Sequence, residues 1–355
     1  MSERATTQAE TPVGWRTLRE LVSPALPANK ILGIIGLLAV VCLYTTLASD
    51  NFLKVGNLEN IVHRTALFGI LSIGVAFVII TGGIDLSIGS VVCLVGVLLP
   101  WLLVEHGWSV PAGVGFVLAL GAGIGLVHGL LITRLGLQPF VVTLCGLLIY
   151  RGVARGLTQD QSQGFGTAFK GLRSLATARF PIFGEGGFQL PATTLIFLVL
   201  AVVAAVFLNR TVWGRYLMAL GRNEQAARYS GIDTGRMKLL AYVIASTLAA
   251  LGGMLFVLDI NAAQPSDFGN FYELYAIAAA VLGGCSLRGG EGSILGLLVG
   301  TALMVVLQNM INLVHPGYQN IEFAIVGGVI LAGVVADELV RRLSRRRPGS
   351  RSWPR

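Results

Sequence analysis

The chain has 355 residues, of which 54% are hydrophobic and only 12% are charged, and its mean hydropathy is +0.74. Soluble globular domains carry about 25% charged residues, so this composition excludes an ordinary soluble protein. The formal net charge of +8 does not indicate nucleic-acid binding, because the cations gather in a few short segments between apolar runs. That arrangement is typical of membrane proteins with a fixed orientation. We therefore predict an all-α, polytopic integral membrane protein.

In chain order, a polar segment at residues 1–30 is followed by a transmembrane domain at 31–337 and a basic tail at 338–355. Runs of membrane length lie at about 31–48, 65–81, 88–104, 111–133, 192–208, 239–257, 294–314 and 321–337. Two shorter stretches, 139–152 and 273–285, are either full spans with polar ends or re-entrant half-helices. Counting both, we expect about ten transmembrane helices and both termini on one side.

The first run has one alternative interpretation, a cleaved signal peptide ending at Thr46-Leu47-Ala48. Its apolar core is longer than the usual stretch of about 7–15 residues, and a polar leader of 30 residues precedes it. We therefore expect 31–48 to remain as the first transmembrane helix.

Orientation follows from three segments that hold many of the cations. They are Arg4, Arg16, Arg19 and Lys30; Arg210, Arg215, Arg222, Arg228, Arg236 and Lys238; and Arg341, Arg342, Arg345, Arg346, Arg347, Arg351 and Arg355. With ten spans all three segments lie on one face, and the positive-inside rule makes that face cytoplasmic. The loop 153–191, expected outside, disagrees because it carries Arg155, Lys170, Arg173 and Arg179. Long loops are translocated across membranes largely independently of their charge, so we keep the ten-span arrangement.

A polar motif from Thr81 to Ser90, TGGIDLSIGS, separates two of the long apolar runs. A carboxylate at the bilayer centre costs about 2.5–3.5 kcal/mol, and irregular backbone at that depth is tolerated only inside protein or beside a cavity. The motif therefore favours a transport protein. Asp85 has two open interpretations: it caps a helix that begins near Leu86, or it contacts the transported substrate.

The segment 209–238 predicts a short helix outside the membrane. Asn223 is a suitable N-cap, Glu224 and Arg228 have the spacing of an ion pair, and Gly231 is a suitable stop. Small residues and bracketing glycines around this helix favour a compact face that a partner protein contacts, rather than a solvated loop.

Two glycine patterns recur. Gly82-Gly83-x-x-Leu86 is echoed by Gly283-Gly284-x-x-Leu287, which indicates either an internal repeat, common in transporters, or chance. Glycine also occurs at four-residue spacing. The positions are Gly121, Gly125 and Gly129, and Gly292, Gly296 and Gly300. Such stripes favour close helix packing within the chain, with a seam between subunits as the alternative.

The inventory of reactive side chains argues against an enzyme. The four histidines form no ligand motif, no cysteine pair has metal-ligand spacing, and no lysine stands in a P-loop. We expect no metal and no cofactor, and any ATP that drives transport is hydrolysed by a separate chain.

Three motifs resemble those of ribose/xylose/arabinose-type ATP-binding cassette (ABC) transporter permeases, in the branched-chain amino acid/sugar permease superfamily. They are Val78–Ser90, Ala219–Ile232 and Tyr272–Ser293, in the family's order, and the resemblance spans roughly 50–337. Tyr275 and Cys285 depart from the family pattern, where a smaller or more polar residue is expected. The resemblance implies a permease subunit of a monosaccharide importer in the bacterial inner membrane, with cytoplasmic termini.

The resemblance also implies three partners: an ABC ATPase subunit, a periplasmic sugar-binding protein, and a second permease subunit, either identical or related. It assigns contact with the ATPase to a coupling segment. Its residues are Gly221, Arg222, Asn223, Glu224, Ala227, Arg228 and Gly231.

For such a permease we expect alternating access without covalent chemistry. A sugar is neutral and rich in hydroxyls, so its path needs hydrogen-bonding side chains. The candidates are Asp85, Ser87, Ser90, Gln308, Asn309 and Asn312. For the last three, hydrogen bonding between helices is an equal alternative. Two rival functions remain open: a proton-coupled secondary transporter in which Asp85 titrates, and a structural or signalling membrane subunit.

Overall fold

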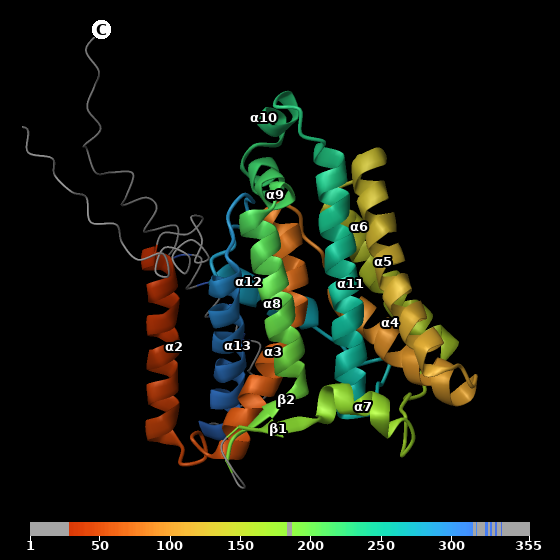
Figure 1. Ribbon diagram of the computed structural model, residues 1–355, viewed down its shortest axis with the longest axis vertical. Helices are drawn as coiled ribbons and strands as arrows, with labels where there is room; N and C mark the ends of the chain where they lie inside the picture. Colours follow the sequence, from red (N-terminus) through yellow and green to blue (C-terminus); the bar gives the residue numbers. More distant parts are fainter. Residues whose placement is uncertain are drawn as a thin grey trace, which may run out of the picture.

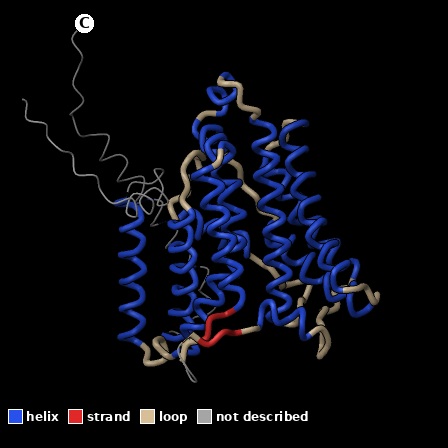
Figure 2. The backbone as a smooth tube through the Cα atoms, viewed as in Figure 1, coloured by secondary structure: helices blue, strands red, loops and turns tan. Residues whose placement is uncertain are grey.

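The computed structural model describes residues 28–182 and 187–314, together with single residues between 317 and 335. Within these parts most of the chain is helical, and the strands form one small hairpin (Figure 2). The helices are α2 (Ala28–Ala48), α3 (Val55–Ile80), α4 (Ile88–Pro100) with a π-helical turn at Trp101–Glu105, α5 (Val110–Arg134), α6 (Pro139–Leu157), α7 (Lys170–Thr177), α8 (Ala192–Arg210), α9 (Val212–Arg222), α10 (Glu224–Tyr229), α11 (Thr234–Ile260), α12 (Tyr272–Leu282) and α13 (Ile294–Val314). The strands β1 (Arg179–Pro181) and β2 (Gln189–Pro191) pair antiparallel.

The all-α, polytopic prediction is confirmed, since eight of the described helices are long and apolar enough to cross a membrane. One of the two stretches predicted to be short is not: 139–152 belongs to α6, which has 19 residues. The other is α12, whose 11 residues span about 16 Å, roughly half of the hydrocarbon core. The predicted span 321–337 and the basic tail 338–355 lie outside the continuously described residues.

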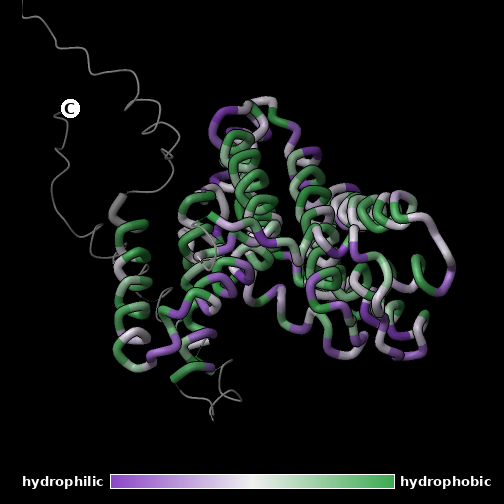
Figure 3. Tube along the Cα trace, turned by 60° about the horizontal axis from the view of Figure 1, so that its bottom comes forward, coloured by the Kyte–Doolittle hydropathy of each residue, from purple (hydrophilic) through white to green (hydrophobic). Residues whose placement is uncertain are grey.

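The bundle has two distinct ends (Figure 1). We call the end that carries α9 and α10 the α10 end, and the end that carries α7, β1 and β2 the hairpin end. Helix α2 begins at the α10 end, and α3 begins at the hairpin end, where its Glu59 contacts the hairpin. The first described residues of the chain and the segment 209–238 thus lie at the same end. Between the ends the chain is mainly hydrophobic (Figure 3).

Three of the four cations of the loop at the hairpin end, Arg155, Arg173 and Arg179, have polar partners within the protein. Arg155 forms an ion pair with Asp160 at 2.8 Å, and Arg179 forms one with Glu59 at 2.9 Å. Arg173 donates a hydrogen bond to the carbonyl oxygen of Leu258, at 3.1 Å, near the C-terminal end of α11. A cation there interacts favourably with the helix dipole.

Glu59 fastens the hairpin to α3, and its removal is expected to loosen the loop. Its carboxylate is buried, pairs with Arg179 and accepts the backbone N–H of Gln189 at 2.7 Å. Glu59→Gln is expected to cost about 1–3 kcal/mol because Arg179 loses its ionic partner. Trypsin should then cleave within 158–191 several times faster in detergent. Asp160→Asn is the control, since its ion pair with Arg155 is exposed and contributes little; equal cleavage of the two variants would contradict this role of Glu59.

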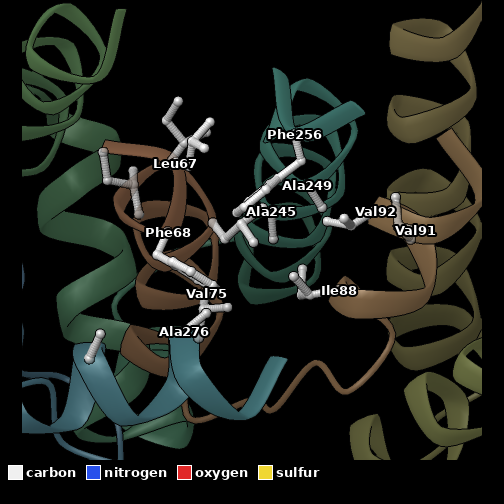
Figure 4. Close-up of a cluster of buried hydrophobic side chains, with 14 of the residues drawn as sticks. Leu67, Phe68, Val75, Ile88, Val91, Val92, Ala245, Ala249, Phe256 and Ala276 are labelled. Carbon is white, nitrogen blue, oxygen red and sulfur yellow. The ribbon is translucent and has the colours of Figure 1, made fainter. Parts of the chain in front are cut away.

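The core lies where α3, α4, α11 and α12 converge (Figure 4). Ala245 and Ala249 of α11 lie between the apolar side chains of α3 and those of α4. On the other side, α5 packs tightly on α11 through its glycine stripe. A Cβ on any of Gly121, Gly125 and Gly129 would collide with atoms of α11. This confirms packing within the chain for the first stripe. In the second, Gly300 packs against α12, but Gly292 lies in the loop before α13 and so is not part of a helical stripe.

Gly125 gives a direct test of this packing. A Cβ there would collide with the carbonyl oxygen of Tyr242 and with Val243, which are backbone atoms and cannot rotate away. We expect Gly125→Ala to destabilise the permease by about 1–3 kcal/mol, seen as a lower midpoint of thermal unfolding in detergent. Gly123→Ala on the same helix is the control, because no atom lies within 4 Å of its Cβ position. Alanine has a higher helix propensity than glycine, so Gly123→Ala should not lower the midpoint, and equal midpoints of the two variants would contradict the contact of Gly125 with α11.

Candidate functional site: two interrupted spans and a coupling segment

Two membrane crossings combine an irregular segment with a helix. We call residues 81–105 the first interrupted span and residues 261–282 the second. In the first, the irregular part 81–87 leaves the α10 end, and α4 begins opposite Ala245 and Ala249, near the middle of α11 (Figure 4). In the second, the irregular part 261–271 leaves the hairpin end of α11, and α12 completes the crossing. Both spans therefore begin with the irregular part, but they cross the bundle in opposite directions.

Helix α3, which precedes the first interrupted span, and α12, which completes the second, end with the same backbone motif. At the end of α3, Gly82 has φ +79° and its N–H bonds to Ile79 O, while the N–H of Gly83 bonds to Val78 O. At the end of α12, Gly284 has φ +92°, and the N–H of Cys285 bonds to Ala280 O. Both are Schellman motifs, which need a residue with positive φ. The equivalent glycines are thus Gly82 and Gly284, one residue out of register with the echo in the sequence.

Asp85 lies inside the bundle and is only 1% exposed. Its Oδ1 accepts hydrogen bonds from the backbone N–H and the hydroxyl of Ser87, at 2.9 and 2.6 Å. Because α4 begins at Ile88 with Ser87 as its N-cap, Asp85 orders the turn just before the helix. Asp85 thus bonds the N-cap residue and not the amides of the first turn as predicted, and the helix begins two residues later than expected. Among the described residues, Asp85 Oδ2 has no hydrogen-bond partner.

The other predicted pathway residues fall into two separate groups. Ser90 lies in the first turn of α4, shortly after Asp85 in the chain, and its hydroxyl donates a hydrogen bond to Leu147 O at 2.8 Å. Asn309 lies at the hairpin end of α13, where it exchanges hydrogen bonds with Asn57 at 2.7 and 3.2 Å. Contact between helices is therefore confirmed for Asn309. Gln308 and Asn312 share this part of α13, and Asn312 is exposed. The structure does not bring the two groups together.

The predicted helix in the coupling segment is present as α10, with six residues. Asn223 Oδ1 accepts the N–H of Ala226 at 2.9 Å, and Gly231 ends the helix with φ +83°. The Glu224–Arg228 pair is long, at 3.7 Å. Glu224 instead binds Lys238 of α11 through both oxygens, each at 2.8 Å. This partner was missed because it is 14 residues away in sequence.

The exposed surface of α10 is small and well defined. Tyr229 is 90% exposed, and the side chain of Arg228 is 71% exposed. A groove of about 360 Å³ is lined by Glu224, Gln225, Arg228 and Tyr229. Since Lys238 holds Glu224, Arg228 and Tyr229 are the side chains freest to contact another protein.

The coupling segment contacts the end of α3 and the loop that follows α12. We call the loops after these two helices, residues 81–87 and 283–293, the motif loops. The N–H of Gly290 bonds to Ile80 O at 2.8 Å, which joins the loop after α12 to the end of α3. Gly221 packs against both of these atoms so closely that a Cβ would overlap them. Arg222 Nε donates to Gly290 O at 3.4 Å. Sequence reasoning did not single out this three-way contact, because the three segments come from distant parts of the chain.

Comparison with known proteins agrees with this geometry. The family described as "Branched-chain amino acid transport system / permease component" matches residues 57–335. The chain is 38% identical to the ribose import permease protein RbsC of Escherichia coli (strain K12), over 86% of this chain and 92% of the relative. It is 36% identical to RbsC of Bacillus subtilis (strain 168), over 87% and 92% of the respective chains.

A third relative, the xylose transport system permease protein XylH of Escherichia coli (strain K12), is 30% identical over 88% of this chain and 92% of its own. No solved structure matches. The family match covers well over half of the chain and includes both interrupted spans and the coupling segment. The chain therefore belongs to the family of branched-chain amino acid transport system permease components.

Proposed function

We propose that the chain is the transmembrane permease subunit of an ABC importer for a monosaccharide, and that this monosaccharide is a pentose such as ribose or xylose. The observation that carries this proposal is the similarity, over nearly the whole length, to permeases named for ribose and xylose import. The chain supplies a passage through the membrane and no covalent chemistry. None of its lysines stands in a phosphate-binding loop, so ATP hydrolysis is assigned to a separate ATPase subunit and no cofactor to this one.

The orientation in this proposal places the α10 end in the cytoplasm of a bacterium and the hairpin end outside the inner membrane. The cations at the α10 end, Arg210, Arg215, Arg228 and Arg236 among them, support it through the positive-inside rule. The ATPase subunit then docks on α10, and the periplasmic sugar-binding protein docks at the hairpin end. Both termini are cytoplasmic.

Transport in this proposal works by alternating access between two permease subunits, identical or related. Closure of the ATPase dimer on ATP moves α10. The move reaches both motif loops through the contact of Gly221 with Ile80 and Gly290. Asp85, Ser87 and Ser90 are buried and shape the first interrupted span, whereas Gln308 and Asn312 at the hairpin end remain candidates for contact with the sugar.

Reconstituted vesicles test the function. The permease is assembled with an ATPase subunit and a sugar-binding protein, and uptake of labelled ribose, xylose and a hexose is measured with ATP enclosed on the α10 side. We expect uptake of a pentose that requires ATP and continues when an ionophore collapses the proton gradient. Uptake that needs the gradient and not ATP would overturn the proposal in favour of a secondary transporter.

A further inference from the structure

The N-terminal ends of α4 and α12 meet inside the bundle. Gly89 lies in the first turn of α4, and a Cβ there would collide with the carboxylate of Glu273 and with the carbonyl oxygen of Gly269. A Cβ on Gly269 would in turn collide with the carbonyl oxygen of Gly89. Only glycine permits this approach of the two backbones. The two interrupted spans therefore cross here, and we call Gly89, Gly269, Glu273 and Arg151 the half-helix junction.

The carboxylate of Glu273, on the second interrupted span, contacts the first. It stands in the first turn of α12, is 7% exposed, and its carboxylate lies against Gly89 in the first turn of α4. The first amides of a helix lack partners within it and carry positive partial charge, so buried ones need an acceptor. The carboxylate on the second interrupted span thus lies at the N-terminal end of the helix of the first, where its charge is favourable. Neither span can be displaced from the other without leaving polar groups buried and unpaired.

Arg151 of α6 completes the junction from a third element. Its Nη1 donates hydrogen bonds to the carbonyl oxygens of Pro265 and Phe268, each at 3.1 Å, and to that of Ser266 at 3.4 Å. These carbonyls belong to the irregular segment that leads into α12. The guanidinium charge also acts on the carboxylate of Glu273. A buried carboxylate in a membrane segment is costly unless such a charge is near.

The junction is connected to both ends of the molecule. Toward the hairpin end, Ala263 exchanges backbone hydrogen bonds with Gln163 of the outer loop, at 2.7 and 3.0 Å. Toward the α10 end, α12 continues into the loop whose Gly290 bonds to Ile80. The second interrupted span therefore connects the two ends of the molecule, and Glu273 links it to α4.

We propose that the half-helix junction is a rigid pivot that makes α4 and α12 move as one body during transport, with Glu273 and Arg151 as its positioning residues. This inference rests on the proposed import function, because a pivot matters only to a protein that alternates between two states. Neither residue touches the sugar in this proposal. Loss of either is therefore expected to slow the conformational switch without weakening the docking of the loaded binding protein.

Transport kinetics in reconstituted vesicles give the first test. Glu273→Gln is expected to lower the maximal import rate at least tenfold, while the concentration of loaded binding protein at half-maximal rate stays within twofold. Glu59→Gln removes another buried carboxylate, but at the hairpin end, and is expected to shift the half-maximal concentration instead. Arg151→Lys should retain more import than Arg151→Gln, because it keeps the charge. A folded Glu273→Gln permease that imports at the normal rate would overturn the proposal.

A native cysteine gives the second test on the permease itself. Cys93 of α4 is buried, with its Sγ 3.4 Å from the carbonyl oxygen of Pro265. In a chain that keeps only this cysteine, a maleimide is expected to leave Cys93 unlabelled with and without trapped ATP, and to label it in Arg151→Gln. Labelling without the substitution in either nucleotide state would show that the spans separate, against a rigid pivot. If no sugar is imported at all, the proposed function fails, yet this labelling still reports on the junction.

Discussion

Gly221→Ala is expected to reduce sugar import about 10- to 100-fold while the ATPase subunit still binds. A Cβ at this position would overlap the carbonyl oxygen of Ile80 and the N–H of Gly290, which form a 2.8 Å hydrogen bond with each other. Backbone atoms cannot rotate away, so α9 must move off the two motif loops, at a cost of about 1–3 kcal/mol. The exposed face of α10 is unchanged, so ATP hydrolysis should continue without import. The measurement is import and hydrolysis in the same vesicles.

Gly235→Ala is the matched control for this experiment. Gly235 belongs to the same segment, 209–238, and the nearest atoms to its Cβ position, at 3.4 and 3.8 Å, are in ordinary van der Waals contact. We expect import close to that of the unmodified permease. If Gly221→Ala imports equally well, the contact among Gly221, Ile80 and Gly290 does not carry the movement of α10 into the membrane.

Replacing Arg228 and Tyr229 together by alanine is expected to weaken binding of the ATPase subunit about 30-fold or more. These two exposed side chains line the groove on α10, and aromatic and arginine side chains carry much of the energy of protein interfaces, with hot spots of about 2 kcal/mol or more. A loss of that size corresponds to roughly a 30-fold change in affinity. The affinity of the purified ATPase subunit for the permease in nanodiscs measures it.

Glu224→Gln serves as the comparison, because the carboxylate of Glu224 is held by Lys238 within the permease. Its effect should appear mainly as lower thermal stability of the segment and much less in affinity. Unchanged affinity of the Arg228→Ala, Tyr229→Ala double variant would show that these two side chains of α10 do not carry the docking, and that the ATPase subunit binds another surface.

The segments that the sequence predicted best are those whose pattern is local. The long apolar runs of α5, α8 and α13 appear close to their predicted bounds, because hydropathy over about 20 residues decides whether a helix crosses a bilayer. The N-cap at Asn223 and the stop at Gly231 were also readable, since both depend on a few neighbouring residues. The glycine stripe of α5 predicted close packing correctly for the same reason.

Predictions failed or stayed incomplete where the outcome depended on distant partners. The stretch 139–152 looked short because Arg151 and Arg155 interrupt its hydropathy, yet these charges find carbonyl and carboxylate partners, and α6 continues to Leu157. Glu273 stood at the edge of a weak apolar stretch and drew no functional prediction. Its importance appears only when Gly89, 184 positions away in numbering (273 − 89), is seen against its carboxylate.

By itself, the amino-acid sequence determined that this protein is a helical membrane permease, roughly where it crosses the membrane, and which short segment could meet a partner. Hydrophobicity and helix capping depend on residues within a few turns of one another, so both can be recognised in the sequence. Only the tertiary structure decided that the two glycine-rich motifs touch each other and Gly221, and that α4 and α12 meet end to end. Those contacts arise from the packing of segments far apart in sequence, which no local pattern encodes.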